Sequence, residues 1–203
     1  MLRLSLHKNP IQEVLKKALK VLREGGIVAY PTESFYGLGV MATEEKALRR
    51  LYELKGRPLE KAMPLIVGNR EILKSLVKSI PPEAEELMER FWPGALTIVF
   101  DAIDGLSEIL TGGTGKIAMR IPGESFALDL ARAADFPITA TSANLSGMPP
   151  AEDADQVMNY FGPDCLGLEL IVDAGRAPAG LPSTIVDVTL TPMRIVRRGR
   201  ILL

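Results

Sequence analysis

The stretch Gly25-Gly26-Ile27-Val28-Ala29-Tyr30-Pro31-Thr32-Glu33 contains the first predicted change from helical to extended backbone in this chain. Before it, apolar residues recur every three or four positions from Ile11 to Leu22, which predicts a helix that the two glycines end. After it, the apolar run from Ile27 to Tyr30 predicts a buried strand. A helix, a buried strand and then polar residues at the strand end indicate an α/β or α+β chain.

The same alternation continues along the rest of the chain. Further helices are predicted at about 43–54, after a cap at Asn69, from Pro81-Pro82 to Trp92-Pro93-Gly94, at 125–134 and around 153–160. Further strands are predicted at 64–67, 96–100, 117–121, 138–141, 168–172, 184–188 and 193–197. Strands outnumber helices towards the end, which favours a mixed, twisted sheet flanked by helices over a strictly parallel sheet. We expect a single domain over residues 1–203.

Composition limits the kinds of partner that the protein can bind. The 24 Lys and Arg nearly balance the 25 Asp and Glu, so the net charge is −1 and a basic site must be local, sized for a small anion. No apolar run reaches the roughly 18 to 20 residues of a membrane span, and the N-terminus lacks a signal-peptide core. The single cysteine, Cys165, excludes an internal disulfide. We expect a cytoplasmic protein with no membrane contact.

Three basic side chains, Lys55, Arg57 and Lys61, occur within seven positions just after a predicted helix. Gly56 and Pro58 both break helices, so we expect the cations on a shaped, exposed loop. A guanidinium can chelate two phosphate oxygens, which favours a phosphate-binding loop. The alternative is a solvated charged turn.

Other motifs do not support a site. The run 111–116 lacks the first glycine and the final Ser or Thr of a nucleotide-triphosphate loop. The run 37–42 fits the dinucleotide fingerprint, but the basic loop stands where the ribose-binding acid should be, so we interpret it as a flexible turn. The only histidine, His7, lies in a chain start that we expect to be frayed, which argues against a Ser/His or Cys/His nucleophile. We predict no metal site in the protein.

Polar residues at strand ends are the remaining candidates. They are Thr32, Glu33, Arg120, Ser142, Asn144, Ser183, Thr184, Arg197 and Arg198. Such edges line the ligand crevice in open α/β sheets. Arg120 interrupts an apolar strand, and a buried arginine needs an anion, so it indicates a bound carboxylate or phosphate. The alternative is an internal salt bridge to an Asp or Glu.

Six strings in order identify a family resemblance. They are Tyr30-Pro31-Thr32-Glu33 with Tyr36-Gly37-Leu38-Gly39, Lys55-Gly56-Arg57-Pro58 with Lys61, Met119-Arg120-Ile121-Pro122, Thr141-Ser142-Ala143-Asn144-Leu145-Ser146-Gly147, Pro182-Ser183-Thr184-Ile185-Val186-Asp187 and Arg197-Arg198-Gly199. On these strings the chain resembles the YrdC/Sua5 family of threonylcarbamoyl-adenylate synthases over nearly its whole length, in the short form without an extra C-terminal domain. Many relatives have Pro where this chain has Ala62, which leaves the loop less rigid.

The resemblance implies a fold, a reaction and a set of roles. The implied fold is a twisted α/β sheet with one large, concave, basic cavity. The implied reaction makes threonylcarbamoyl-AMP and pyrophosphate from L-threonine, bicarbonate and ATP, for the N6-threonylcarbamoyladenosine modification of tRNA. A downstream threonylcarbamoyl-transferase complex is the implied partner, and Mg²⁺ accompanies ATP with no protein ligand identified. By resemblance, ATP is contacted by Lys55, Arg57, Lys61, Ser142, Asn144 and Arg197, with Lys55 and Arg57 as catalytic residues, and threonine by Thr32, Arg120 and Ser183.

Two alternatives stay open at this point. A concave basic surface could bind double-stranded RNA or tRNA, although only 5% of residues are aromatic and the net charge is close to zero. The chain could also be a YciO-type paralogue, or resemble the related domain of hydrogenase-maturation carbamoyltransferases. Lys55→Ala and Arg57→Ala are expected to abolish pyrophosphate release without unfolding the chain, because both residues are expected on an exposed loop.

Overall fold

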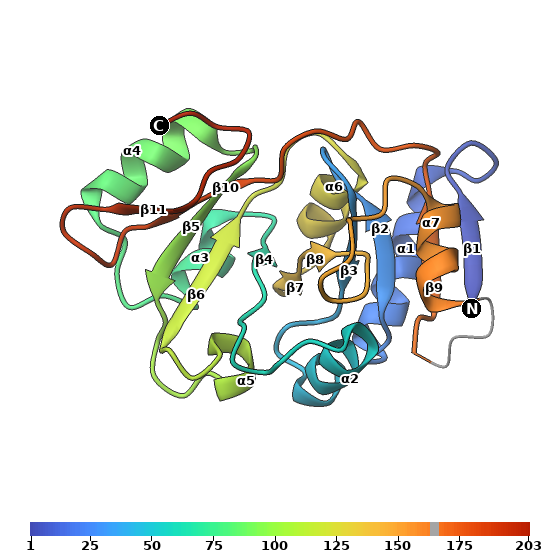
Figure 1. The fold of residues 1–203 in the computed structure, drawn as a ribbon, viewed down its shortest axis with the longest axis horizontal. Helices are drawn as coiled ribbons and strands as arrows, with labels where there is room; N and C mark the ends of the chain where they lie inside the picture. Colours follow the sequence, from blue (N-terminus) through green and yellow to red (C-terminus); the bar gives the residue numbers. More distant parts are fainter. Residues whose placement is uncertain (163–166) are drawn as a thin grey trace.

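Two mixed β-sheets lie side by side along the long axis of the molecule (Figure 1). The computed structural model describes residues 1–162 and 167–203, and Cys165 lies outside them. The first sheet has the spatial order β1 (Leu2–Ser5), β9 (Leu170–Asp173), β2 (Val28–Pro31), β3 (Tyr36–Gly39), β8 (Thr141–Ser142). Its strands β1, β9 and β2 run parallel, whereas β3 is antiparallel to both β2 and β8.

The second sheet contains six strands of the described chain. Its spatial order is β11 (Arg194–Arg197), β10 (Thr184–Asp187), β5 (Leu96–Asp101), β6 (Lys116–Arg120), β4 (Leu65–Ile66), β7 (Ile138–Thr139). The pairs β10 with β5 and β4 with β6 are parallel, and the other neighbours are antiparallel. The prediction of a mixed α/β architecture is confirmed, but the strands divide between two sheets and do not form one.

The helices begin and end where the local sequence satisfies their terminal groups. They are α1 (Ile11–Arg23), α2 (Glu45–Lys55), α3 (Arg70–Lys74), α4 (Pro82–Phe91), α5 (Glu108–Thr111), α6 (Phe126–Ala133) and α7 (Ala154–Phe161). Asn69 Oδ1 accepts the Ile72 N–H at 2.9 Å, which caps α3 as predicted. Gly56 ends α2 with φ +58°, a left-handed conformation that glycine adopts without strain.

Helices α1 and α6 pack against one face of the first sheet. The apolar stripe of α1, with Val14 and Leu22 fully buried, meets Leu130 of α6 and Val28 of β2. A larger apolar cluster fills the space between the first sheet, helix α2 and the second sheet. The two sheets are therefore joined through a continuous core.

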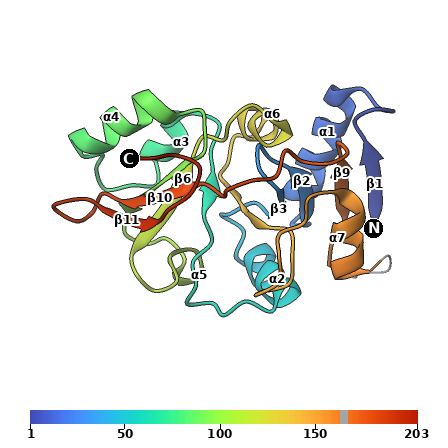
Figure 2. The ribbon, with the colours of Figure 1, turned by 45° about the horizontal axis from the view of Figure 1, so that its top comes forward.

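Besides the segment between β3 and β4, which includes α2, two chain segments carry the backbone from one sheet to the other. Strand β7 of the second sheet and strand β8 of the first are separated only by Ala140. The segment between β9 and β10 crosses back in the opposite direction, as the turned view in Figure 2 shows. Residues at both crossings therefore lie at the junction of the sheets.

Two local predictions are wrong. Residues 36–39 form the buried strand β3, paired along its length with β2, so the flexible turn predicted over 37–42 is wrong for residues 37–39. The start of the chain forms β1, which pairs with β9 and is fastened by Arg3 to Asp173 at 2.8 Å, where a frayed end was predicted. Both strands owe their order to partners that are distant in the sequence.

Candidate active site between the two sheets

A cavity of about 560 Å³ lies at the junction of the sheets. Six of the predicted site residues line it: Thr32, Arg57, Arg120, Ser142, Ser183 and Arg197. Further lining residues that matter below are Ser34, Thr97 and Ala140. Three lining residues are arginines and none of the described lining residues is acidic, so the cavity suits an anion.

Lys55 lies behind the cavity wall and not on an exposed loop. It is the last residue of α2 and only 2% exposed. Its Nζ donates to Ser142 O at 2.5 Å, to Asn144 O at 2.7 Å and to Asn144 Oδ1 at 3.3 Å. The expectation of an exposed Lys55 is therefore wrong: the ammonium fastens the 142–144 segment to the end of α2.

The 142–144 segment is held by its own side chains as well. Ser142 Oγ donates to Asn144 Oδ1 at 2.5 Å, and Asn144 Nδ2 donates to Met148 O. Burial, together with the charge of Arg57, lowers the pKa of Lys55 to about 8. At neutral pH the ammonium is still mostly protonated, so all three of its N–H groups are available to this segment.

Arg57 is the residue of the basic loop that reaches the cavity. Its Nε donates to Lys61 O at 2.8 Å and one Nη to Ala62 O at 3.1 Å, which closes the loop on itself. Tyr52 also donates to Lys61 O, at 3.1 Å. These two bonds to Lys61 O hold the Lys61 carbonyl group in place even though residue 62 is alanine and not proline. Lys61 itself is exposed and does not line the cavity.

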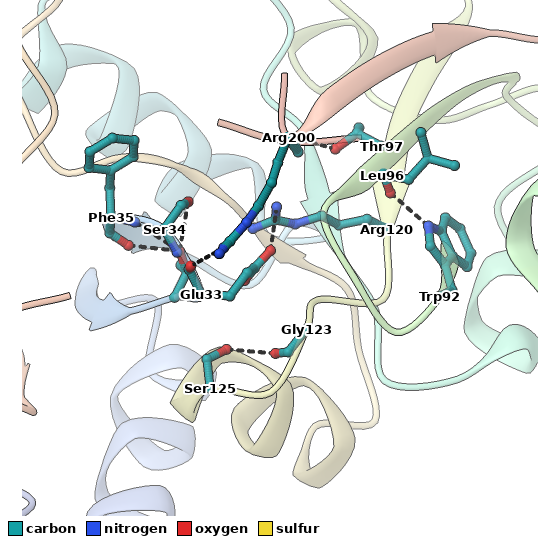
Figure 3. A network of polar contacts seen from close by, with 12 residues as sticks. Glu33, Ser34, Phe35, Trp92, Leu96, Thr97, Arg120, Gly123, Ser125 and Arg200 are labelled. Atoms are coloured by element: carbon teal, nitrogen blue, oxygen red, sulfur yellow. Dashed lines mark hydrogen bonds and ion pairs between the residues drawn. The ribbon is translucent and has the colours of Figure 1, made fainter. Parts of the chain in front are cut away.

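Arg120 pairs with Glu33 across the junction of the sheets. Arg120 Nη1 lies 2.9 Å from Glu33 Oε1, and the two side chains are 9% and 11% exposed (Figure 3). Neither Glu33 carboxylate oxygen receives a well-directed hydrogen bond from the described residues. The internal salt bridge considered for Arg120 is present, and Arg120 also lines the cavity.

The C-terminal residues complete the wall on the side of the second sheet. Arg197 Nη2 and Nε donate to Ser183 O at 2.7 and 3.1 Å, and Nη2 also donates to Ser183 Oγ at 3.0 Å. Burial and the nearby charge of Arg120 lower the pKa of Arg197. Arg200 Nη1 donates to Glu33 O at 2.9 Å, as Figure 3 shows, so the chain end ties the Glu33 loop to the second sheet.

Gly199 allows the C-terminal backbone to approach the Pro182-Ser183 backbone. A Cβ at this position would lie 2.2 Å from Pro182 O and 2.6 Å from Ser183 C. Backbone atoms cannot turn away as a side chain can, so we expect Gly199→Ala to lower the free energy of unfolding by about 1–3 kcal/mol, measured by urea denaturation. Gly167→Ala is the control, because its Cβ would meet Leu54 Cδ1 at 3.5 Å, an ordinary contact. Equal stability of the two variants would contradict this account.

Sequence reasoning missed several residues of the site. Thr97 lines the cavity from β5, and the signal was the same as for Arg120: one polar residue inside an apolar strand. Glu33 was noticed as a polar residue after a strand, but its pairing with Arg120 was not. Arg200 gave no distinguishing signal in the sequence.

A family model named for Sua5, YciO and YrdC, and described as "Telomere recombination", matches residues 20–199. The chain belongs to the Sua5/YciO/YrdC family. The resemblance inferred from the six strings is confirmed.

Individual members of the Sua5/YciO/YrdC family match this chain closely. A threonylcarbamoyl-AMP synthase of Pyrococcus abyssi (strain GE5 / Orsay) is 39% identical over 186 residues, covering 91% of this chain and 54% of that protein. The crystal structure of P. abyssi Sua5 complexed with L-threonine aligns with a TM-score of 0.89 at 37% identity, over 98% of this chain and 57% of that one. Escherichia coli YciO aligns with a TM-score of 0.81 at 25% identity, over 98% and 93% of the two chains. The chain spans about half the length of two of the curated relatives that it matches, 54% and 49%.

No helix within residues 1–162 and 167–203 is long and apolar enough to cross a bilayer. No group of three or more His, Cys, Asp or Glu side chains in these ranges is placed to hold a metal ion.

Proposed function

We propose that this protein is a threonylcarbamoyl-AMP synthase that makes its adenylate and pyrophosphate from L-threonine, bicarbonate and ATP. The observation that carries the proposal is the single cavity in which Thr32, Arg57, Arg120, Ser142, Ser183 and Arg197 converge from separate segments. Its volume lies within the roughly 300–1,000 Å³ typical of small-molecule sites. Family relatives carrying the synthase name add support.

The reaction requires positioning and charge neutralisation more than a reactive side chain. The threonine amine loses a proton and its nitrogen forms a bond to CO₂ derived from bicarbonate, which gives a carbamate. A carbamate oxygen then forms a bond to the α-phosphorus of ATP, while the bond from that phosphorus to the leaving pyrophosphate breaks. Fixed cations and hydroxyl donors suffice for such an in-line transfer.

Roles for the nucleotide side are proposed from the family resemblance, and the cavity lining supports them. We assign Arg57, Ser142 and Arg197 to ATP by the family resemblance, and all three line the cavity. Lys55 and Asn144 do not line the cavity, but their hydrogen bonds hold the 142–144 segment, which carries Ser142, in place. Lys61 precedes the lining residue Ala62, so its long side chain is assigned to the outer phosphates.

The amino-acid side is assigned to Thr32, Arg120 and Ser183. All three line the cavity, and Arg120 carries the charge that a substrate carboxylate needs. Thr32 Oγ1 donates to Phe35 O at 2.8 Å, which fixes the turn at the end of β2. Mg²⁺ is proposed to enter with the nucleotide, ligated by phosphate oxygens. The adenylate would pass to a threonylcarbamoyl-transferase complex acting on tRNA, in the cytoplasm.

A pyrophosphate assay tests the proposal. With ATP and bicarbonate, release is expected to depend on threonine, and Arg57→Ala is expected to lower it about 100-fold or more, because it removes a cation from the phosphate side. Arg49→Ala is the control, since Arg49 lies on the exposed face of α2 and pairs with Glu45 at 2.7 Å. Release that is indifferent to threonine would instead favour a YciO-type paralogue, and tight RNA binding without release would favour an RNA-binding role.

A further inference from the structure

The hydroxyl groups of Thr97 and Ser183 form a pair in the cavity wall. Their oxygens lie 2.9 Å apart, and both residues line the cavity although they are only 1% and 7% exposed. Thr97 stands on β5 and Ser183 directly precedes β10, two strands that pair in parallel. The sheet register therefore holds the two hydroxyls together.

The number of hydrogens decides what this pair can do. Two hydroxyls carry two hydrogens, and the bond between their oxygens uses one of them. Arg197 is a donor only, so its Nη2 occupies an acceptor site of Ser183 Oγ at 3.0 Å and takes no hydrogen from the pair. Thr97 Oγ1 has no hydrogen-bond partner other than Ser183 among the described residues. One hydroxyl hydrogen is therefore left at the cavity wall.

The direction of the chain of donors places that hydrogen on Thr97. A cationic N–H that donates to Ser183 Oγ polarises the serine hydroxyl and makes it the better donor. The cooperative arrangement is then head to tail, from Arg197 to Ser183 to Thr97. Thr97 is the end of this chain, and none of the described residues accepts its hydrogen.

The surrounding charge indicates which acceptor fits. Arg197 has no carboxylate at ion-pair distance among the described residues, and the charge of Arg120 is close enough to lower the Arg197 pKa. Glu33 pairs with Arg120 and not with Arg197, so it offsets the charge of Arg120 only. A wall with two guanidinium groups and one unused hydroxyl hydrogen is complementary to an anionic oxygen.

We propose that Thr97 is a further substrate-binding residue, which donates its hydroxyl hydrogen to an anionic oxygen of the bound substrate as the last member of the Arg197–Ser183–Thr97 chain. The anionic oxygen belongs to the amino-acid carboxylate or to a nucleotide phosphate. This inference rests on the proposed function, because it requires both groups to enter the cavity.

Steady-state kinetics of Thr97→Val tests the inference. Valine has nearly the shape of threonine but no hydroxyl, so the KM for one substrate is expected to rise about tenfold to hundredfold, as for a lost hydrogen bond to a charged group. A rise for threonine identifies the carboxylate as the acceptor, and a rise for ATP identifies a phosphate. Thr97→Ser keeps the donor and is expected to stay within about threefold of the parent, below the tenfold expected for a lost hydrogen bond.

A control and two opposing outcomes complete the test. Thr111→Val removes another buried hydroxyl, in α5 and outside the cavity lining, and is expected to leave both KM values unchanged. Unchanged KM values in Thr97→Val would overturn the inference. So would a raised KM in Ser183→Ala that Thr97→Val does not share. Failure of the proposed function looks different, because the parent protein itself would then show no threonine-dependent release.

Discussion

Lys55→Met is expected to abolish pyrophosphate release and to destabilise the fold at the same time. Methionine fills the space of the lysine stem but leaves Ser142 O, Asn144 O and Asn144 Oδ1 without their common donor. A buried acceptor without a partner costs about 1–3 kcal/mol, so we expect a loss of about 2–4 kcal/mol in the free energy of unfolding. The 142–144 segment would shift, and a misplacement of about 1 Å can lower a rate about 100-fold.

Two measurements are needed, urea denaturation and pyrophosphate release. Lys61→Met is the matched control for stability, because Lys61 is exposed and a substitution at such a site changes stability by no more than about 0.5 kcal/mol. If Lys55→Met were as stable as the parent while inactive, Lys55 would act on substrate directly and not through the 142–144 segment.

The pH dependence of stability gives a second check on Lys55. Its folded pKa is lowered to about 8 from 10.5, so between these values the unfolded chain binds more protons than the folded chain. The lysine contribution to stability therefore increases as the pH rises through this window. The stability difference between the parent and Lys55→Met is expected to grow between pH 8 and pH 10.5. A difference that stays constant would contradict the lowered pKa.

Glu33→Gln is expected to be the most destabilising single change at the site. It would leave the Arg120 guanidinium, 9% exposed, without its anion at 2.9 Å. Breaking one side of a buried ion pair costs about 3–5 kcal/mol, because the remaining charge stays buried and unpaired. Thermal or urea unfolding measures the loss, which should exceed that of Lys55→Met.

Two further variants separate this effect from a general surface effect. Glu33→Gln combined with Arg120→Gln is expected to recover most of the lost stability, since no unpaired charge remains. Glu45→Gln breaks the exposed pair with Arg49, whose members are 51% and 53% exposed, and is expected to cost less than about 1 kcal/mol. Similar losses for Glu33→Gln and Glu45→Gln would show that the Glu33 pair does not matter for stability.

Local sequence patterns predicted most helices and strands with bounds close to those observed. The Asn69 cap, the Pro82 start of α4 and the Gly56 end of α2 are local devices, because the capping partners lie within a few residues along the chain. Strands β1 and β3 were missed because a short strand is ordered by its neighbours in the sheet, and those neighbours are distant in sequence.

The candidate residues came from chemical type and order along the chain, and six of nine line one cavity. Of the other three, Lys55 and Asn144 are buried and Lys61 is exposed, and none of them lines the cavity. Lys55 is the last residue of α2 and precedes a loop, and no local signal showed that the 142–144 segment covers it. The roles of Thr97 and Glu33 likewise follow from their contacts in the folded chain. Thr97 lies next to Ser183, and Glu33 pairs with Arg120.

Helix ends and apolar periodicity could be predicted from the sequence alone, since each depends on residues that are near neighbours along the chain. Family membership followed from the same order, through strings that are individually short. The division into two sheets, the cavity at their junction and the partners of Lys55, Arg120 and Thr97 required the folded chain. Contacts between segments a hundred residues apart arise from packing of the whole core, and no local pattern encodes them.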